Sequence, residues 1–288
     1  MDPSFLQWKN STWLFDRRKT AHASLFDHAR QPWDALAALG DYILALLEDE
    51  VLQLGSSRHA DDESEGIETD YARGASETND VRETGGVSRK EIPVANLRRV
   101  TSLPGVQLTG ELWVGKDTEI EPGVTIEGPV RIGSGCRVEP GVLIRGPSWI
   151  GDNCEIRQAA YLRGFVLAAD NVVLGHACEF KHCALLGYAQ APHFNYVGDS
   201  ILGFKAHIGA GVILSNVRLD KRTVKVSDFA PSKERIETGL EKFGAIIGDE
   251  CEIGCNSVLN PGTILGAHCC VLPLSRVSGT WAQNSRIQ

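Results

Sequence analysis

The stretch that decides the fold is Glu111–Gly164, ELWVGKDTEIEPGVTIEGPVRIGSGCRVEPGVLIRGPSWIGDNCEIRQAAYLRG. Aliphatic side chains recur in it at every sixth position, and they are Val114, Ile120, Ile126, Ile132, Val138, Ile144, Ile150, Ile156 and Leu162. Neither the period of a helix, about 3.6 residues, nor that of a strand, about 2, explains this spacing. A parallel β-helix does, because three units, each a short strand and a corner, close one turn of about 18 residues.

The same spacing extends beyond this stretch, with Leu174, Phe180 and Leu186 after it and a restart from Leu202 that continues to Val277. Stacked turns pair their strands ~4.8 Å apart and place the aliphatic side chains inside the prism. We therefore expect an all-β domain over residues 103–280, with roughly seven turns that share one core.

Two segments precede this domain. Residues 1–54 contain an apolar pattern at three- and four-residue steps from Pro32 to Leu54, which predicts an amphipathic helix that packs against the main domain or a neighbouring subunit. Residues 55–92 hold ten Asp or Glu against five Lys or Arg and few large apolar residues. Such a composition predicts a disordered acidic linker.

Composition excludes several classes of protein. The 288 residues carry a formal net charge of -8, and the sequence pI is near 5.5, which argues against nucleic-acid binding. No apolar run of ~18 residues predicts a membrane span, and the amino terminus does not resemble a secretory signal. We expect a soluble, cytoplasmic protein.

Five of the eight cysteines fall four residues after the aliphatic position, where a corner requires a small side chain; they are Cys136, Cys154, Cys178, Cys251 and Cys269. One shared position indicates packing. The absence of a CxxC pair argues against a structural zinc site or a disulfide framework.

The period breaks twice, and functional residues are often carried by such interruptions. Gly187–Gly198 (GYAQAPHFNYVG) shifts the phase, which predicts a loop that leaves the prism and carries His193 and Tyr196. Arg218–Phe243 is a longer insertion, rich in Lys and Arg, that also predicts a projecting loop.

The stretch EFKHCALLGYAQAPHFNYVGDSILGFKAHIGAGVILSN, with EKFGAIIGDECEIG after the insertion, resembles a known family. It is similar to the acetyltransferase half of the bifunctional N-acetylglucosamine-1-phosphate uridyltransferase/glucosamine-1-phosphate acetyltransferase, over roughly residues 110–280. The resemblance implies a left-handed β-helix, a homotrimer and acetyl-CoA as co-substrate. No counterpart of the uridyltransferase half is recognisable, so that activity is not expected.

The resemblance also implies roles for individual residues. His193 matches the general base and Glu179 a carboxylate near it, while the sugar-phosphate ligands are expected at Arg163, Lys181, Tyr196, His207 and Lys242. The positions near the cofactor are Ala210, Asn216 and Cys255. Three departures stand out: His207 replaces an Asn, Cys255 replaces a Ser, and Leu272–Leu274 replaces an Ala-Gly run.

The residues themselves are compatible with this chemistry. A neutral imidazole is able to accept a proton near pH 7, although a histidine in a loop is also often bonded to a backbone carbonyl. Arg163 and Lys181 are one turn apart, so we expect them side by side, either bridged by a phosphate or simply solvated. Glu179 either orients His193 or neutralises Lys181, and the sequence does not separate these alternatives.

A zinc site of three histidines, as in carbonic-anhydrase-like members of this fold, is not expected. His176 and His182 lie six residues apart and so point from different faces of one turn. The sequence thus predicts an N-acetyltransferase for an amino-sugar phosphate without a metal. The alternatives are a non-catalytic sugar-nucleotide-binding or scaffold protein, and an acyltransferase for another nucleotide-linked amino sugar.

Overall fold

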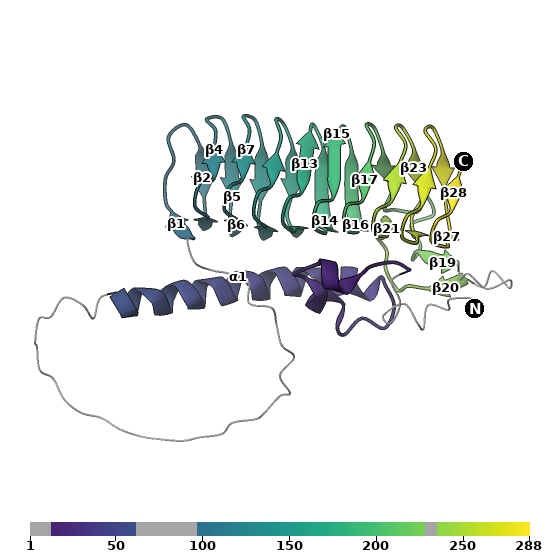
Figure 1. Cartoon of the computed structure of the whole chain (residues 1–288), viewed down its shortest axis with the longest axis horizontal. Coiled ribbons are helices and arrows are strands. Elements are labelled where there is room, and N and C mark those ends of the chain that lie inside the picture. The colour runs from purple at the N-terminus through teal and green to yellow at the C-terminus, as the bar shows by residue number, and fades with distance from the viewer. Residues whose placement is uncertain (1–12, 62–96, 228–234) are drawn as a thin grey trace, which may run out of the picture.

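The computed structural model describes residues 13–61, 97–227 and 235–288. From Gln107 to Ile287 the chain winds into a left-handed parallel β-helix, which confirms the predicted fold class (Figure 1). Each of its three faces carries nine strands, so the expectation of about seven turns is too low, and the prism continues past residue 280.

Face I is one continuous parallel sheet. Its strands are β4 (Glu119–Ile120), β7 (Arg137–Val138), β10 (Glu155–Ile156), β13 (Val173–His176), β15 (Gln190–His193), β17 (His207–Ile208), β22 (Glu252–Ile253), β25 (Cys270–Val271) and β28 (Arg286–Ile287).

Faces II and III belong to one sheet because two long strands, β14 (Glu179–Leu185) and β16 (Tyr196–Leu202), run across the corner between them. Face II also contains β2 (Gln107–Thr109), β5 (Thr125–Glu127), β8 (Leu143–Arg145), β11 (Tyr161–Arg163), β18 (Ile213–Leu214), β23 (Val258–Leu259) and β26 (Arg276–Val277). Face III adds β3 (Leu112–Val114), β6 (Val130–Ile132), β9 (Ser148–Ile150), β12 (Val166–Ala168), β21 (Ala245–Ile247), β24 (Thr263–Leu265) and β27 (Thr280–Trp281), with β1 (Arg98–Val100) antiparallel to β3.

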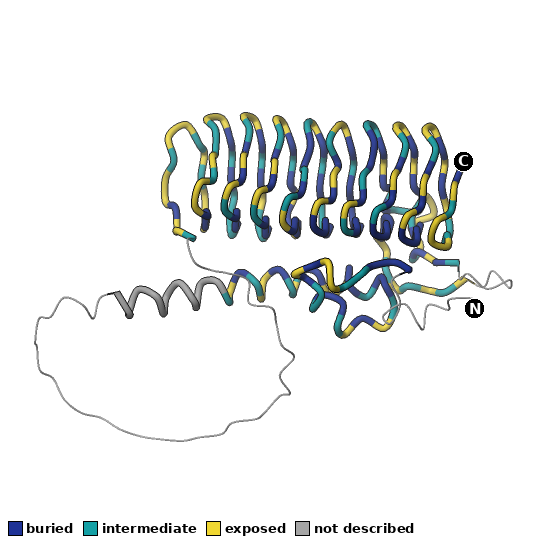
Figure 2. Tube along the Cα trace, viewed as in Figure 1, coloured by how far each residue is buried: buried dark blue, intermediate teal, exposed yellow. Residues whose placement is uncertain are grey.

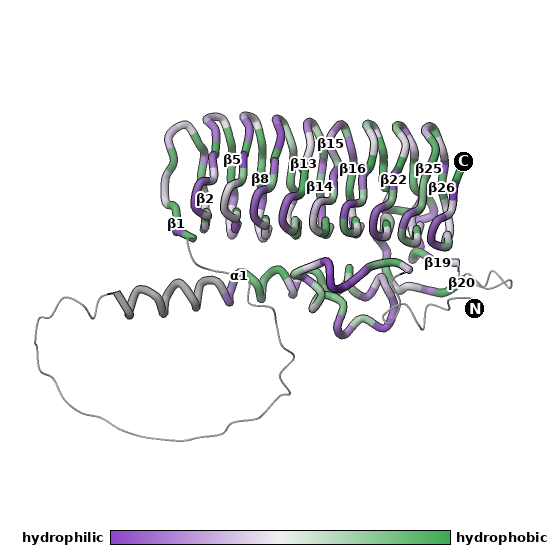
Figure 3. Tube along the Cα trace, viewed as in Figure 1, coloured by the Kyte–Doolittle hydropathy of each residue, from purple (hydrophilic) through white to green (hydrophobic). Residues whose placement is uncertain are grey.

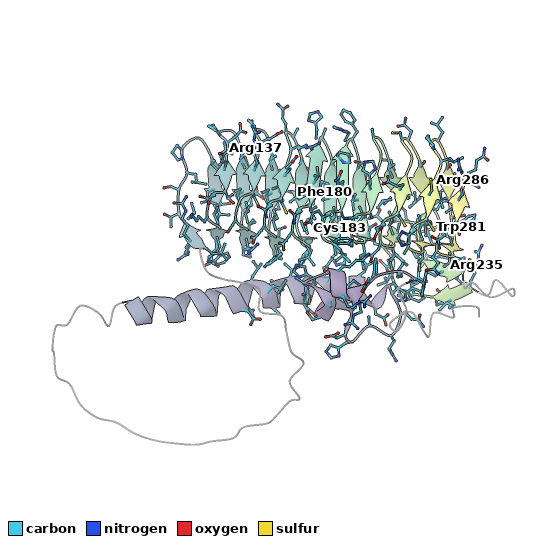
Figure 4. All side chains as sticks on the ribbon, in the orientation of Figure 1. Arg137, Phe180, Cys183, Arg235, Trp281 and Arg286 are labelled. Atoms are coloured by element: carbon cyan, nitrogen blue, oxygen red, sulfur yellow. The ribbon has the colours of Figure 1, made fainter. Side chains whose placement is uncertain are left out.

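The aliphatic residues stack inside the prism as the period predicts. Ile126 pairs with Ile144, Ile144 with Leu162 and Leu162 with Phe180, and all four are fully buried. Figure 4 shows Phe180 and Cys183 between the faces. Burying side chains of this size contributes about 1.5–3 kcal/mol each, so the column is a main source of stability. The five cysteines of the shared position are also buried in this core, which confirms that they are packing residues.

The predicted loop at 187–198 is wrong. Gln190–His193 and Tyr196–Leu202 are strands of the prism. The turn is one residue short, because Leu162 pairs with Phe180, 18 residues on, whereas Val166 pairs with Cys183, 17 residues on. The missing residue lies at the corner occupied by His182, and a second short corner follows at Asp199. Each shortening shifts the phase without ejecting the chain.

The shortening also changes which leucine faces the core. Leu185, rather than the predicted Leu186, lies in the inner column opposite Ala168 and Leu202. Leu186 is buried instead in a second cluster outside the prism.

That second cluster joins face III to the amino-terminal segment, which contains the short 3₁₀ helices η2 (Arg17–Lys19) and η3 (Ala23–Phe26) and the helix α1 (Asp34–Asp61). The buried positions of α1 are Trp33 just before it and Leu36, Leu39, Ile43 and Leu47 within it, as the apolar pattern predicts. They pack on outward side chains of face III such as Trp149 and Leu167. The helical segment therefore packs against the main domain, one of the two expected partners, and lies along one side of the prism (Figures 2 and 3).

The boundaries of the amino-terminal part differ from the prediction. Helix α1 continues to Asp61, seven residues into the segment predicted to be a linker. The rest of that prediction, residues 62–92, lies outside the described residues, as do residues 1–12 of the predicted helical segment. No helix of the described part combines the length and apolarity that a membrane crossing requires.

The described part of the insertion at 218–243 contains two paired strands. Strands β19 (Lys225–Ser227) and β20 (Arg235–Glu237) form an antiparallel hairpin, and Val224 and Val226 are buried in the second cluster. It leaves and re-enters the prism at the corner between faces II and III, since Phe243 donates its backbone N–H to Asn216 and Gly244 to Asp199.

Candidate active site

Face II carries a column of three cations. Arg145, Arg163 and Lys181 occupy the same outward position on β8, β11 and β14, one turn apart. This confirms that Arg163 and Lys181 are neighbours. The adjacent outward position of these turns and the next is filled by Leu143, Tyr161, Glu179 and Tyr196. Four of the predicted site residues therefore share one face.

The two predicted cations each have a carboxylate partner. Arg163 Nη1 donates to Glu179 Oε1 at 2.7 Å, and Lys181 Nζ lies 3.1 Å from Asp199 Oδ2. Neither contact expected for Glu179 is present, because it binds Arg163 rather than His193 or Lys181. The reason is geometric: long side chains on one face reach the next turn, where Glu179 faces Arg163 and Asp199 faces Lys181.

Asp199 is the centre of a buried polar cluster that the sequence analysis missed. Its side chain is 6% exposed, and its carboxylate accepts hydrogen bonds from Asn216 Nδ2 and Lys181 and lies 3.1 Å from His182 Nδ1. Burial alone raises the pKa of a carboxyl group, but the contacts with His182, Asn216 and Lys181 outweigh it and hold the pKa of Asp199 below its usual value. The signal in the sequence was the Tyr-x-Gly-Asp run at 196–199.

Tyr196 closes this cluster on its outer side. Its pKa is raised by burial and by the nearby charge of Asp199, so the phenol stays protonated. Its hydroxyl lies over Gly198, where an added Cβ would come within 2.5 Å of Tyr196 Oη and 2.9 Å of Asn216 Nδ2. The glycine is required by this close approach rather than by its backbone angles.

His193 lies at the other edge of face II, at the corner where β15 of face I ends. The equivalent corner positions of successive turns are Gln158, His176, His193, Ala210, Cys255 and Pro273. Asn195 fixes this corner: it is buried, accepts the backbone N–H of His193 at 3.2 Å and donates to Gly209 O at 2.7 Å. The imidazole itself is exposed and has no hydrogen-bond partner among the described residues.

The structure therefore brings two of the predicted cofactor positions together with His193. Ala210 and Cys255 follow His193 along the same corner, one and two turns on. Cys255 is exposed, and both side chains are small, so they leave the imidazole accessible from that side. Asn216, the third predicted position, lies at the opposite edge of face II beside Asp199.

His193 does not lie beside the cation column within the chain. Lys181 pairs with Gly198, five residues beyond His193, and the chain turns one corner on the way. At ~3.3 Å per residue this places the two side-chain positions roughly 10–16 Å apart. The imidazole and the cation column of one chain therefore lie at opposite edges of face II.

The two other predicted ligands, His207 and Lys242, lie on different parts of the chain. His207 is on face I, where its Nδ1 lies 2.8 Å from Glu252 Oε2. Lys242 is exposed and forms a β-bridge with Val217 at the base of the insertion, next to Asn216. Lys242 is thus near the Asp199 cluster, but His207 is not on face II.

The two histidines compared with a zinc site, His176 and His182, have separate partners. His176 Nδ1 lies 2.9 Å from Gln158 O at the corner of His193, whereas His182 contacts Asp199 at the opposite edge of face II. Within residues 13–61, 97–227 and 235–288, no group of three His, Cys, Asp or Glu side chains is placed to hold a metal ion.

Residues 111–146 match the family model of the bacterial transferase hexapeptide (six repeats). The chain is a hexapeptide-repeat β-helix. The hexapeptide-repeat chain is 34% identical over 100 residues to the bifunctional sugar-1-phosphate nucleotidylyltransferase/acetyltransferase of Sulfurisphaera tokodaii. The matched stretch covers 35% of this chain and 24% of that protein. It is 33% identical over 99 residues to the bifunctional protein GlmU of Methanocaldococcus jannaschii, 34% of this chain and 23% of that protein.

A third relative is the putative uncharacterized acetyltransferase YaiX of Escherichia coli, 33% identical over 94 residues, 33% of this chain and 40% of that protein. The chain spans about a quarter of the length of the first two relatives. The resemblance expected from the sequence is confirmed, and it supports an acyltransferase coarsely, without fixing the substrate.

Proposed function

We propose that the chain is an acetyl-CoA-dependent N-acetyltransferase that acts on an amino-sugar phosphate. The observation that carries the proposal is the arrangement of face II, with an accessible imidazole at one edge and a column of cationic side chains at the other. The matches to proteins named as sugar-phosphate acetyltransferases support the same class.

In this reaction the amine nitrogen of the acceptor attacks the thioester carbonyl. The new carbon–nitrogen bond forms, the carbon–sulfur bond breaks, and the amine proton passes to His193 and then to the departing CoA thiolate. A neutral imidazole with a free nitrogen is suited to this step, and general-base catalysis typically contributes ~10²- to 10⁴-fold. The exposed ring of His193, without a bond to a backbone carbonyl, supports this role.

The acceptor is held by Arg163, Lys181 and Tyr196, with Lys242 at the base of the insertion. Glu179 fixes the guanidinium of Arg163, and Asp199 fixes the ammonium of Lys181, so both cations are oriented before the phosphate arrives. Acetyl-CoA follows the corner from His193 past Ala210 to Cys255.

Because His193 and Lys181 lie at opposite edges of one face, the proposed site needs a second copy of the chain. His193 of one copy then faces the cation column of the next, in a closed ring such as a homotrimer. His207, which is on face I near the corner of His193, belongs to the same side of such an interface as the base.

The test measures release of CoA by the purified chain from acetyl-CoA and glucosamine-1-phosphate. We expect release by the native chain and a loss of at least about a hundredfold in His193→Ala. The matched control is His268→Asn, an exposed histidine with a positive φ of 59° that Asn tolerates, and it should retain activity.

The alternative of a scaffold protein has one observation in its favour: Leu274, at the corner that follows Cys255, is 80% exposed where acetyl-CoA would lie. A calorimetric titration separates the two. Heat on adding acetyl-CoA supports the enzyme, and its absence together with no CoA release supports the scaffold.

A further inference from the structure

The cation column is longer than the two residues assigned to the phosphate. Arg145 on β8 is in register with Arg163 on β11, so a third cation lies one turn, ~4.8 Å, beyond the pair. Before Arg145 the same position holds Glu127, so the column ends there.

The guanidinium of Arg145 is held in place along the face. Its Nε donates to Glu127 Oε2 at 2.8 Å and its Nη1 to Tyr161 Oη at 2.7 Å. The Tyr161 ring lies between the two arginines, 5.5 Å from the guanidinium carbon of Arg145 and 5.9 Å from that of Arg163. Tyr161 therefore holds Arg145 by a hydrogen bond and lies against the guanidinium of Arg163, which Glu179 holds.

Both arginines keep donors for a ligand. Arg145 uses Nε and Nη1, and Arg163 uses Nη1, so Nη2 of Arg145 and Nε and Nη2 of Arg163 have no acceptor in the described part of the chain. The two side chains are 47% and 42% exposed. Their carboxylate partners lie on exposed sites, where an ion pair contributes little. Arg163 therefore presents the edge that carries Nε and Nη2 to a phosphate, and Arg145 presents the single donor group Nη2.

The order of residues along the prism gives the column a direction. Ala210 and Cys255 follow His193 toward the carboxyl-terminal turns, whereas Lys181, Arg163 and Arg145 belong to successively earlier turns. The two substrates therefore meet at the turn of His193 from opposite ends. An acceptor that continues past its first phosphate has Arg145 as the next cation on its path.

We infer that Arg145 is a specificity-determining residue that binds a second phosphate, so the acceptor is an amino sugar linked to a nucleoside through a diphosphate. The inference rests on the proposed function. Arg163 and Lys181 hold the phosphate attached to the sugar, and Arg145 holds the phosphate attached to the nucleoside. Charge-assisted contacts of this kind give both affinity and orientation.

The experiment compares two acceptors, glucosamine-1-phosphate and uridine-diphosphate glucosamine, with acetyl-CoA in both cases. The variants are Arg145→Gln and the matched control Arg137→Gln. Arg137 is also an exposed arginine bound to a glutamate, Glu121, but it lies on face I (Figure 4).

For the native chain we expect a KM at least about tenfold lower for the diphosphate-linked acceptor. Arg145→Gln should raise that KM roughly 10- to 100-fold, the loss of one charged hydrogen-bonding group, and change the KM for the monophosphate less than about threefold. Arg137→Gln should change neither.

Equal use of the two acceptors by the native chain, or an equal effect of Arg145→Gln on both, overturns the inference and leaves the proposed function intact. No CoA release with either acceptor overturns the proposed function instead. In that event calorimetry with the same two ligands still decides the second-phosphate site: tighter binding of the diphosphate that Arg145→Gln abolishes supports it, and equal binding overturns it.

Discussion

Gly198→Ala tests the cluster that joins Tyr196, Asn216 and Asp199. A Cβ at this position would lie 2.5 Å from Tyr196 Oη, 2.7 Å from its Cζ and 2.9 Å from Asn216 Nδ2. All three separations are far below van der Waals contact, so the phenol ring must move and Asn216 must shift from Asp199. Overpacking of this kind typically costs about 1–3 kcal/mol of unfolding free energy.

The matched control is Gly187→Ala, in the preceding turn. A Cβ there meets nothing closer than 3.6 Å, and Gly187 does not have a positive φ. Unfolding by urea, followed by tryptophan fluorescence, measures both variants. We expect Gly198→Ala to lose about 1–3 kcal/mol and Gly187→Ala less than about 0.5 kcal/mol.

The same variant has a second readout if the chain acetylates an amino-sugar phosphate. Displacing the Tyr196 hydroxyl removes one hydrogen bond to the charged acceptor, so KM for the acceptor should rise roughly tenfold or more while KM for acetyl-CoA changes little. Equal stability of the two glycine variants, with unchanged KM in both, would refute the assignment of Tyr196 to this cluster.

Three further outcomes concern Asp249, which is buried and accepts the backbone N–H groups of Asp16 and Phe204, the Asp199 cluster described above, and Gly40 in α1. Burial raises the pKa of Asp249 to about 6, so the stability that its protonated form contributes is fully present below pH ~3.9. About 3 kcal/mol of that stability is lost as the pH rises through 6. Asp249→Asn should flatten this decline in urea titrations from pH 4 to 7.5, and an unchanged slope would count against the role of Asp249. Asp199→Ala removes the partner of Lys181 and His182 and should lower the free energy of unfolding by about 1–3 kcal/mol at pH 7. This loss should shrink only below pH ~3.9, as the pH falls toward the lowered pKa of Asp199. A loss that stays constant into that acidic range would contradict the assignment. In Gly40→Ala, within α1, the added Cβ meets only the Phe165 ring, at 3.4 Å, so the substitution should raise the unfolding free energy by about 0.5–1 kcal/mol. A loss of stability would show that the helix packs more closely on the prism than described.

The strict period predicted the prism because an inward aliphatic residue at every sixth position leaves one solution, and Ile126, Ile144 and Leu162 stack as expected. The short corners at His182 and Asp199 were not predictable in the same way. One missing residue shifts the phase of the pattern whether the chain shortens a turn or leaves the prism. The sequence therefore predicts a loop at Gly187–Gly198 and a core position for Leu186, and both predictions are wrong.

For Arg163 and Lys181 the sequence predicts the shared face of the prism but not the contact partners of the side chains on it. The 18-residue step correctly places Arg163 beside Lys181, because the register of adjacent turns depends only on chain length. Contact partners depend on where flexible side chains reach, and Glu179 lies within reach of Arg163 on the neighbouring turn rather than of His193. The separation of His193 from Lys181 follows from the strand that lies between the two edges of face II, which spacing along the sequence does not reveal.

The most direct measurement of the central claim mixes two inactive variants, His193→Ala and Lys181→Ala, in one assembly by unfolding and refolding them together. If each site takes its imidazole from one copy and its ammonium from the next, an equal mixture in any closed ring restores about a quarter of the sites. We predict that the mixture recovers about a quarter of the native rate of CoA release, while each variant refolded alone stays inactive. A mixture no more active than the two variants measured separately would contradict the account.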